Sequence, residues 1–130
     1  MKSTHATLWI DHHEARIVHL QDEGPGYETV AVHGPHGQTH NKRHDAGHRH
    51  GVERDYADRV ATALAEVSEI LLVGPSTAKD ELMKELQSHH PAIAKRVLGV
   101  EAHDHATDGQ LADHARRFFK ASDRLRGHVH

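Results

Sequence analysis

The sequence predicts an α/β fold in which helices cover a mixed β-sheet, and three observations carry this prediction. Apolar and polar residues alternate over residues 6–33, which is typical of half-buried strands. From residue 53 onward apolar residues recur at helical spacing, and two short apolar stretches, 70–73 and 97–100, interrupt that pattern. A chain of 130 residues is expected to build one core, so we expect residues 1–130 to form a single domain.

The first third of the chain is expected to form an antiparallel meander of three strands, at residues 6–10, 15–20 and 27–32. The second turn contains Gly-Pro-Gly, and the first contains Asp-His-His-Glu at residues 11–14. Histidine and carboxylate are also metal ligands. We interpret residues 11–14 as a turn because four polar residues between strands are typical of an exposed hairpin.

The rest of the chain predicts β-α-β-α units after a first helix. That helix is expected from Glu53 to about Glu66, before a strand at 70–73 that is buried on both faces. Ser76 can cap the next helix, and Pro91 follows its end.

The last strand is expected at 97–100, and the last helix begins at a capping box formed by Thr107 and Gln110. This helix start explains the polar segment 103–108, His-Asp-His-Ala-Thr-Asp, as structural rather than metal-binding. The aromatic residues in regular elements are expected in the core rather than in a base-stacking surface. They are Trp9, Phe118 and Phe119.

Residues 33–51 are the most unusual segment, with six histidines, four glycines and almost no apolar side chain. A loop of this length without core-facing residues is usually functional or disordered. We therefore expect this His-rich loop to be the interaction surface of the protein.

Composition limits the partners. The net charge of −3 with neutral histidines argues against constitutive nucleic-acid binding, but protonation of the 17 histidines would make the chain strongly positive. The absence of cysteine excludes thiolate metal sites and is compatible with a reducing compartment. No stretch is long and apolar enough for a membrane span or a signal segment, so we expect a cytoplasmic protein with no membrane partner.

Four motifs carry a family resemblance. They are WIDHHEARI at 9–17, GPSTAKDEL at 74–82, RVLGV at 96–100 and TDGQL at 107–111. The last three are similar to the second half of the middle domain of archaeo-eukaryotic peptide-chain release factors and Pelota. Together with the His-rich middle, the first motif and the Gly-Pro turn resemble small bacterial release-factor-like proteins described as translational machinery proteins. The resemblance implies the release factor middle-domain fold and a ribosome-associated role in translation, with rRNA or tRNA rather than DNA as the partner.

In the release factor domain, the loop between the third strand and the first long helix carries a Gly-Gly-Gln tip that promotes hydrolysis of peptidyl-tRNA. The matching position here holds Gly37-Gln38, and His36 replaces the first glycine. A histidine restricts the backbone where paired glycines would admit the ester oxyanion. Gln38 remains the catalytic candidate for peptidyl-tRNA hydrolysis. Because His36 departs from the release factor motif, we rank this hypothesis third, and enzymatic function is the minority interpretation. We also do not expect this chain to be a complete release factor, since it has no recognisable codon-reading domain or ribosome-stalk-binding domain.

The second-ranked hypothesis is transition-metal binding by the same loop. His36, His40, His44 and His48 are each four residues apart, so neighbouring pairs would share one face of a helix. A short helix over 38–46 would make His40 and His44 the best pair, with His48 and His50 at its flank. Zn²⁺ or Ni²⁺ would suit such ligands, whereas the first hypothesis requires no cofactor.

The first-ranked hypothesis is a ribosome-associated, RNA-binding protein, and it depends on local clusters of cations. Contacts to phosphate would come from the loop and from the Gly-Pro turn and last helix. The candidate residues are Lys42, Arg43, Arg49, Lys79, Arg116, Arg117 and Lys120.

Overall fold

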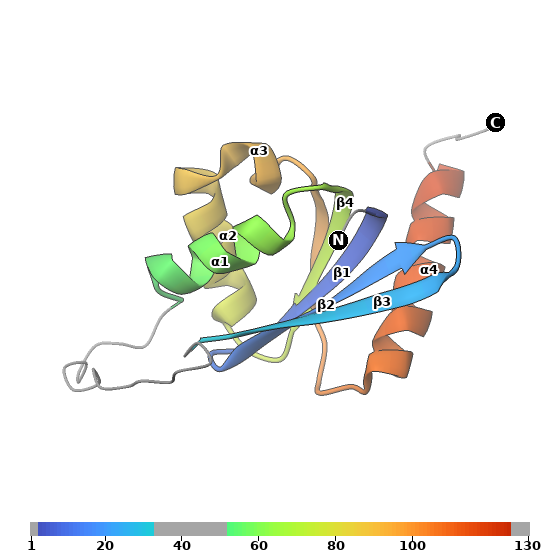
Figure 1. Ribbon diagram of the computed structural model, residues 1–130, viewed down its shortest axis with the longest axis horizontal. Helices are drawn as coiled ribbons and strands as arrows, with labels where there is room; N and C mark the ends of the chain where they lie inside the picture. Colours follow the sequence, from blue (N-terminus) through green and yellow to red (C-terminus); the bar gives the residue numbers. More distant parts are fainter. Residues whose placement is uncertain (1–2, 33–51, 126–130) are drawn as a thin grey trace.

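A computed structural model describes residues 3–32 and 52–125, so the predicted His-rich loop lies outside the described residues. The described residues form three layers, and the middle layer is a five-stranded sheet of order β3-β2-β1-β4-β5. Helices α1, α2 and α3 cover one face of the sheet, and α4 covers the other (Figure 1). The predicted α/β class with a mixed, helix-covered sheet is confirmed.

The antiparallel half of the sheet is the predicted meander. It consists of β1 (Ser3–Ile10), β2 (Glu14–Gln21) and β3 (Gly24–Ala31), with Leu8 opposite Ile17 between the first two strands. The turn after β1 is organised by the Asp11 carboxylate, whose Oδ1 accepts from the backbone N–H of His13 (2.8 Å) and of Glu14 (2.9 Å). This local bond is the reason that Asp-His-His-Glu turns the chain. The turn prediction is therefore correct.

The parallel half consists of β4 (Val67–Gly74) beside β1, and β5 (Val97–Ala102) beside β4. All side chains from Ile70 to Val73 are buried, as the continuous apolar stretch predicts for a strand covered on both faces. The chain also approaches itself closely at the end of β4. A Cβ atom added at Gly74 would lie 2.3 Å from the carbonyl oxygen of Ile10, so only glycine fits there.

The helices are α1 (Arg54–Ala63), α2 (Ala78–His89), α3 (Pro91–Ala94) and α4 (Asp108–Leu125). Helix α1 ends at Ala63, earlier than predicted, because the chain must turn before it enters β4. Pro91 follows the end of α2, as predicted, and it also begins the short α3, which was not predicted. Strands β1, β3 and β4 begin three residues earlier than predicted, so the Gly-Pro-Gly sequence at 24–26, predicted as a turn, is the start of β3.

The two predicted helix caps have different outcomes. The capping box of α4 is confirmed, because Thr107 Oγ1 accepts from Gln110 N (3.1 Å) and Gln110 Oε1 accepts from Thr107 N (2.9 Å). Thr77, not Ser76, occupies the N-cap position of α2. Ser76 Oγ accepts a long bond of 3.4 Å from Ala78 N. The Ser76 prediction was therefore wrong by one position.

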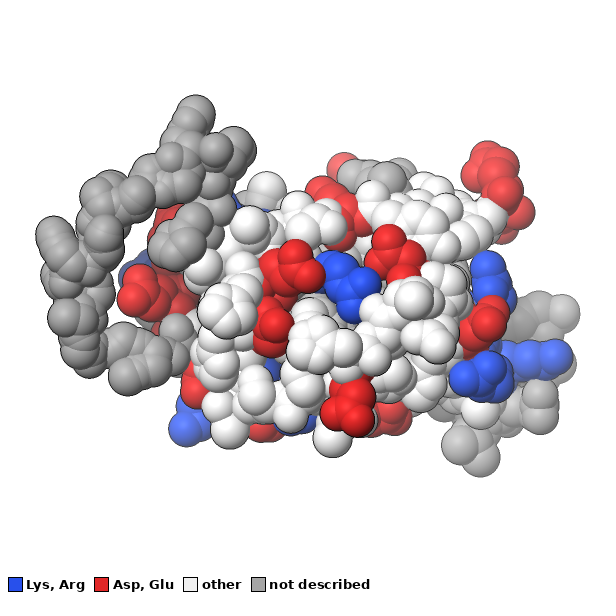
Figure 2. Space-filling model, turned by 90° about the horizontal axis from the view of Figure 1, so that it is seen from below, with Lys and Arg blue, Asp and Glu red and all other residues white. Residues whose placement is uncertain are grey.

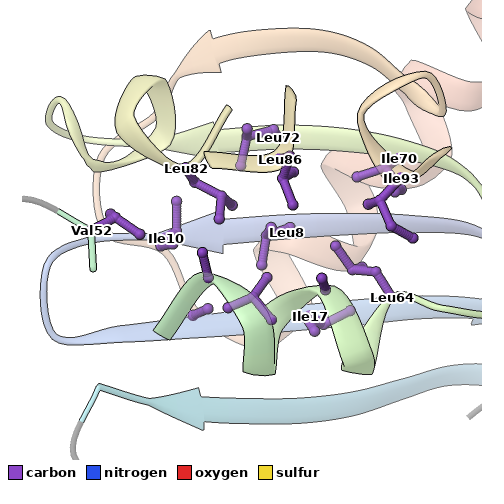
Figure 3. Close-up of a cluster of buried hydrophobic side chains, with 14 of the residues drawn as sticks. Leu8, Ile10, Ile17, Val52, Leu64, Ile70, Leu72, Leu82, Leu86 and Ile93 are labelled. Atoms are coloured by element: carbon purple, nitrogen blue, oxygen red, sulfur yellow. The ribbon is translucent and has the colours of Figure 1, made fainter. Parts of the chain in front are cut away.

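The sheet separates two apolar clusters. On the α1–α3 side, strand residues such as Leu8 and Ile17 point toward Leu64, Leu82 and Leu86 of the helical layer (Figure 3). On the α4 side the cluster contains Trp9 and Phe119, both almost fully buried, with Phe118 packed against it. The prediction that the aromatic residues belong to the core is confirmed.

Candidate functional site

The candidate site lies where β1 and β4 end. Carboxyl ends of parallel strands meet at one edge of a sheet, and this edge is where open α/β sheets commonly place their ligands. The turn after β1 and the turn after β4 lie here (Figure 1). Val32 and Val52, which flank segment 33–51, also lie here, because Val32 bonds to the turn after β1 and Val52 bonds to Glu81. We call Val32, Val52, His12, Arg59 and Glu81 the loop base.

Glu81 of α2 is the centre of the loop base. Its Oε1 accepts from His12 Nε2 at 2.9 Å and from the backbone N–H of Val52 at 2.9 Å, and its Oε2 accepts from Thr77 Oγ1 at 3.0 Å. Burial alone would raise the pKa of Glu81, but the hydrogen bonds from His12 and Thr77 and the His12 charge outweigh it, so the pKa is lowered. One carboxylate thus joins the β1–β2 turn, the start of α2 and Val52, two residues before α1.

Arg59 of α1 holds the other end of the segment. Its guanidinium donates to the carbonyl oxygens of Ala31 and Val32, both at 2.6 Å, and its Nε lies 3.2 Å from Asp55. The backbone N–H of Val32 also donates to the His13 carbonyl at 2.8 Å. Both ends of segment 33–51 are therefore fixed to the body of the domain by hydrogen bonds that do not involve the segment itself.

Tyr56 and Asp11 lie next to the loop base and are joined to each other by a hydrogen bond. The Tyr56 hydroxyl donates to the Asp11 carbonyl at 3.2 Å, and burial, followed by the Asp11 and Glu14 carboxylates, raises the pKa of this hydroxyl. It stays protonated at physiological pH. His105 Nε2 lies 3.8 Å from Asp11 Oδ2, and its ring packs 4.9 Å from that of Trp9.

The segment 103–108 is bound to β1 and β2 and leads into the predicted start of α4. Trp9 Nε1 donates to the Asp104 carbonyl at 3.2 Å, and Arg16 donates to the Asp108 carboxylate at 3.2 Å. The Arg16 guanidinium also lies 4.8 Å from the Trp9 ring centre. In residues 3–32 and 52–125, no group of three potential ligands is arranged to hold a metal ion.

Most of the predicted site residues cannot be placed. The catalytic, metal and loop cation candidates lie outside the described residues; they are Gln38, His36, His40, His44, His48, His50, Lys42, Arg43 and Arg49.

The remaining predicted cations are described, and they lie apart from one another. Lys79 Nζ donates to the Ser76 carbonyl at 2.6 Å and lies 3.6 Å from Asp80, so its ammonium is bound within its own turn. On α4, Arg116 pairs with Asp113 at 2.9 Å, whereas Arg117 and Lys120 are exposed with no ion pair to any described residue. Helix α4 covers the sheet face opposite to α2, so the structure does not bring Lys79 together with the α4 cations.

Acidic side chains separate the basic ones on the face shown in Figure 2. That face carries no continuous basic surface. On that face, any affinity for a polyanion must therefore come from small local groups of cations. No helix in the described part of the chain could cross a membrane.

Sequence reasoning missed Arg59 and Glu81. No local pattern indicates either residue, because Glu81 meets His12 across 69 positions of sequence and Arg59 meets Ala31 across 28. His12 belongs to a turn that was recognised, but its partner could not be predicted without the fold.

The architecture defines a three-layer α/β domain with a mixed sheet and a long segment inserted between its third strand and first helix. Solved structures of Pelota share this fold. Pelota from Archaeoglobus fulgidus matches over 97% of this chain and 38% of its own, with 14% identity and a TM-score of 0.53. Pelota from Thermoplasma acidophilum matches over 88% of this chain and 36% of its own, with 21% identity and a TM-score of 0.54.

The similarity covers nearly the whole of this chain but little more than a third of each Pelota chain. No family model matches the sequence, and no curated protein does. The comparison therefore shows the Pelota-type fold, which confirms the fold resemblance carried by the sequence motifs. A fold does not by itself transfer an activity.

Proposed function

We propose that this chain is a translation-related, ribosome-associated protein with a release-factor-like domain, and that segment 33–51 is its RNA-facing interaction surface. One observation supports this proposal above the others: in a Pelota-type fold, both ends of a His-rich segment are fixed between β3 and α1. This is the connection in which the resembled domain carries its functional loop. The segment supplies Lys42, Arg43 and Arg49 as contacts to phosphate.

Co-sedimentation with ribosomes tests the proposal. The wild type is expected to migrate with ribosomal subunits, with or without a chelator, and a variant in which residues 36–50 are replaced by a short Gly-Ser linker is expected to stay at the top of the gradient. The deletion should still fold, because the hydrogen bonds at Val32 and Val52 lie outside it and loop length affects closure entropy only weakly. A wild type absent from ribosomal fractions would contradict the proposal.

Charge-reversal variants test whether the ribosome-binding surface is the loop or helix α4. Arg117→Glu with Lys120→Glu reverses two α4 cations that have no ion pair with any described residue, and Arg54→Glu with Lys84→Glu makes the same change in net charge elsewhere. If the loop is the main surface, both double variants should bind ribosomes more weakly by a similar, small factor. A much larger loss in the α4 variant would move the interface to α4.

Transition-metal binding is the second candidate function, and the four-residue spacing of His36, His40, His44 and His48 favours it. Untagged protein would then bind Zn²⁺ or Ni²⁺ at a defined stoichiometry. His40→Ala with His44→Ala should abolish the tightest site, and His89→Ala with His90→Ala should leave it unchanged. Graded losses from every histidine would indicate non-specific chelation.

Peptidyl-tRNA hydrolysis through Gln38 is the third candidate. Gly37-Gln38 matches the last two residues of the release-factor tip. An assay of ester hydrolysis on ribosome-bound peptidyl-tRNA tests it, with Gln38→Ala as the inactive variant. Ribosome binding without Gln38-dependent release would leave the binding function and remove the enzymatic one.

A further inference from the structure

Strand β5 ends the sheet, and no described segment pairs with its outer edge. Two of its side chains are the unusual feature. Leu98 is 38% exposed and Val100 is 40% exposed, which makes them two of the three exposed large apolar side chains among the described residues. Natural edge strands usually carry charges, prolines or bulges that oppose pairing with another chain. Strand β5 has no proline, its Glu101 carboxylate is bound to His114 at 3.1 Å, and its one irregularity is the register shift at Leu98.

Leu98 and Val100 share one face of the sheet. Val100 lies opposite Leu72 in the register with β4, and Leu72 belongs to the cluster on the α1–α3 side. Gly99, between them, faces the other side, since a Cβ atom there would meet Leu71 and Phe118 at 3.5 and 3.6 Å. The register with β4 shifts between Ile70 and Leu71, so Leu98 is an additional residue opposite β4; from Leu98 to Val100 exposed and half-buried residues alternate, which places Leu98 and Val100 on the same side of the strand.

This arrangement is complementary to itself. If two β5 strands pair antiparallel about a two-fold axis through Gly99, Leu98 of each copy lies directly opposite Val100 of the other. Residues directly opposite each other in an antiparallel pair point to the same face. The four exposed apolar side chains then form one cluster, and this is the two-fold register that places Leu98 directly opposite Val100.

Charge supports the same arrangement. Lys95 and Arg96 precede β5, and Glu101 and Asp104 lie at or beyond its other end. Antiparallel pairing places the basic beginning of one strand beside the acidic end of its partner. Lys95 is exposed and has no ion pair with any described residue, so it is available for such a contact.

The opposite edge of the sheet lacks this complementarity. Strand β3 begins with Gly24, which has a φ of 130°, and Pro25, which cannot donate to a ladder. Its exposed apolar residue, Tyr27, has no apolar neighbour of similar exposure on that strand. Tyr27 therefore offers a matched control for β5.

We propose that the outer edge of β5 is an interface for a second copy of this chain, which extends the sheet through an isologous β5–β5 pair centred on Gly99. A C₂ dimer with one self-complementary patch is the commonest form of homo-oligomer. The interface lies on a strand that takes no part in the loop base, so dimerisation and ribosome binding can be tested separately.

Sedimentation velocity over a wide range of protein concentration is the first test. The wild type is expected to change from monomer to dimer as concentration rises. Val100→Lys should raise the dimer dissociation constant at least about tenfold, because two ammonium groups would enter the apolar cluster. Tyr27→Lys should leave the constant unchanged. A wild type that stays monomeric, or equal effects of the two variants, would overturn the proposal.

Disulfide trapping tests the register and does not depend on Val100→Lys folding. The chain has no cysteine, and opposed residues of an antiparallel pair have the Cα separation that a disulfide needs. Leu98→Cys with Val100→Cys should give a covalent dimer under mild oxidation, whereas each single variant and Tyr27→Cys with Thr29→Cys should remain monomeric. Absence of the trapped dimer in the Leu98 and Val100 double variant would overturn the proposed register.

Discussion

At the scale of single residues, two side chains of this domain connect backbone segments that are far apart in the sequence. Glu81 accepts three hydrogen bonds from three different parts of the chain, and Arg59 donates to two consecutive carbonyl groups at the end of β3. Neither contact contributes much apolar burial. Their effect is to fix the entry and the exit of segment 33–51 relative to the sheet.

Glu81→Gln is expected to lower the free energy of unfolding at neutral pH by about 1 kcal/mol, since charge-assisted hydrogen bonds are lost and partial exposure screens them. Because its pKa is lowered on folding, Glu81 stabilises the native state above the ordinary glutamate pKa of 4.5, and this stabilisation is lost as pH falls through the lower folded value. Urea titrations at several pH values should show the two proteins converging in acid. Exposed Glu53→Gln, beside Val52, is the control and should have little effect; a constant difference at every pH would contradict the prediction.

Gly74→Ala is expected to destabilise the fold by about 1–3 kcal/mol, because the new methyl group would collide with the Ile10 carbonyl where β1 and β4 end. Gly109→Ala is the matched control. A Cβ atom there meets only Thr107 Oγ1, at 4.0 Å, and alanine favours a helix, so the control should be neutral or slightly stabilising. Equal unfolding midpoints for Gly74→Ala and the wild type would exclude the collision.

At the scale of elements, local sequence patterns predict the positions of helices and strands, but they do not predict how one element connects to the next. The meander follows from alternation and turn residues, β4 follows from its continuous apolar stretch, and the start of α4 follows from Thr107 and Gln110. The end of α1, the short α3 and the cap of α2 depend on how the chain must turn to enter the next element. The contacts of Glu81 and Arg59 were invisible in the sequence because they join residues far apart along it.

Thr107→Ala should destabilise α4 and lower the free energy of unfolding by about 1 kcal/mol, because one half of the capping box is lost. Thermal unfolding followed by circular dichroism measures this. Thr62→Ala provides the comparison, since Thr62 lies inside α1 and its hydroxyl donates to the Asp58 carbonyl. That variant should be close to neutral, because alanine is the better helix former.

At the scale of the whole molecule, the net charge depends on the protonation of the histidines. The chain has 17 histidines against a net charge of −3, so acidification changes the sign of its charge more steeply than in an ordinary domain of this size. Among the described histidines, His5, His12, His19, His90 and His114 lie within 3.1 Å of a carboxylate. The six histidines at positions 33–50 lie outside the described residues, and the proposed function assigns them to the RNA-facing surface.

Affinity for ribosomal RNA is therefore expected to rise as pH falls from about 7.5 to about 6, and to fall with added salt at either pH. A variant with His36, His40, His44, His48 and His50 replaced by Gln keeps polarity but removes their titration, so its affinity should respond less to pH. Filter binding or fluorescence anisotropy at constant ionic strength measures this. Equal pH dependence in both proteins would show that this segment does not face RNA, and metal binding would become the leading hypothesis.

The anchoring of Val32 and Val52 has a consequence for protein engineering and for sequence divergence. Because both anchors are formed by residues outside positions 33–51, the sequence between them is free to change without loss of the bonds that hold its ends. The domain is in this sense a display scaffold. Foreign peptides of comparable length could be grafted between Val32 and Val52, and natural selection could alter recognition there while the packed core stayed the same.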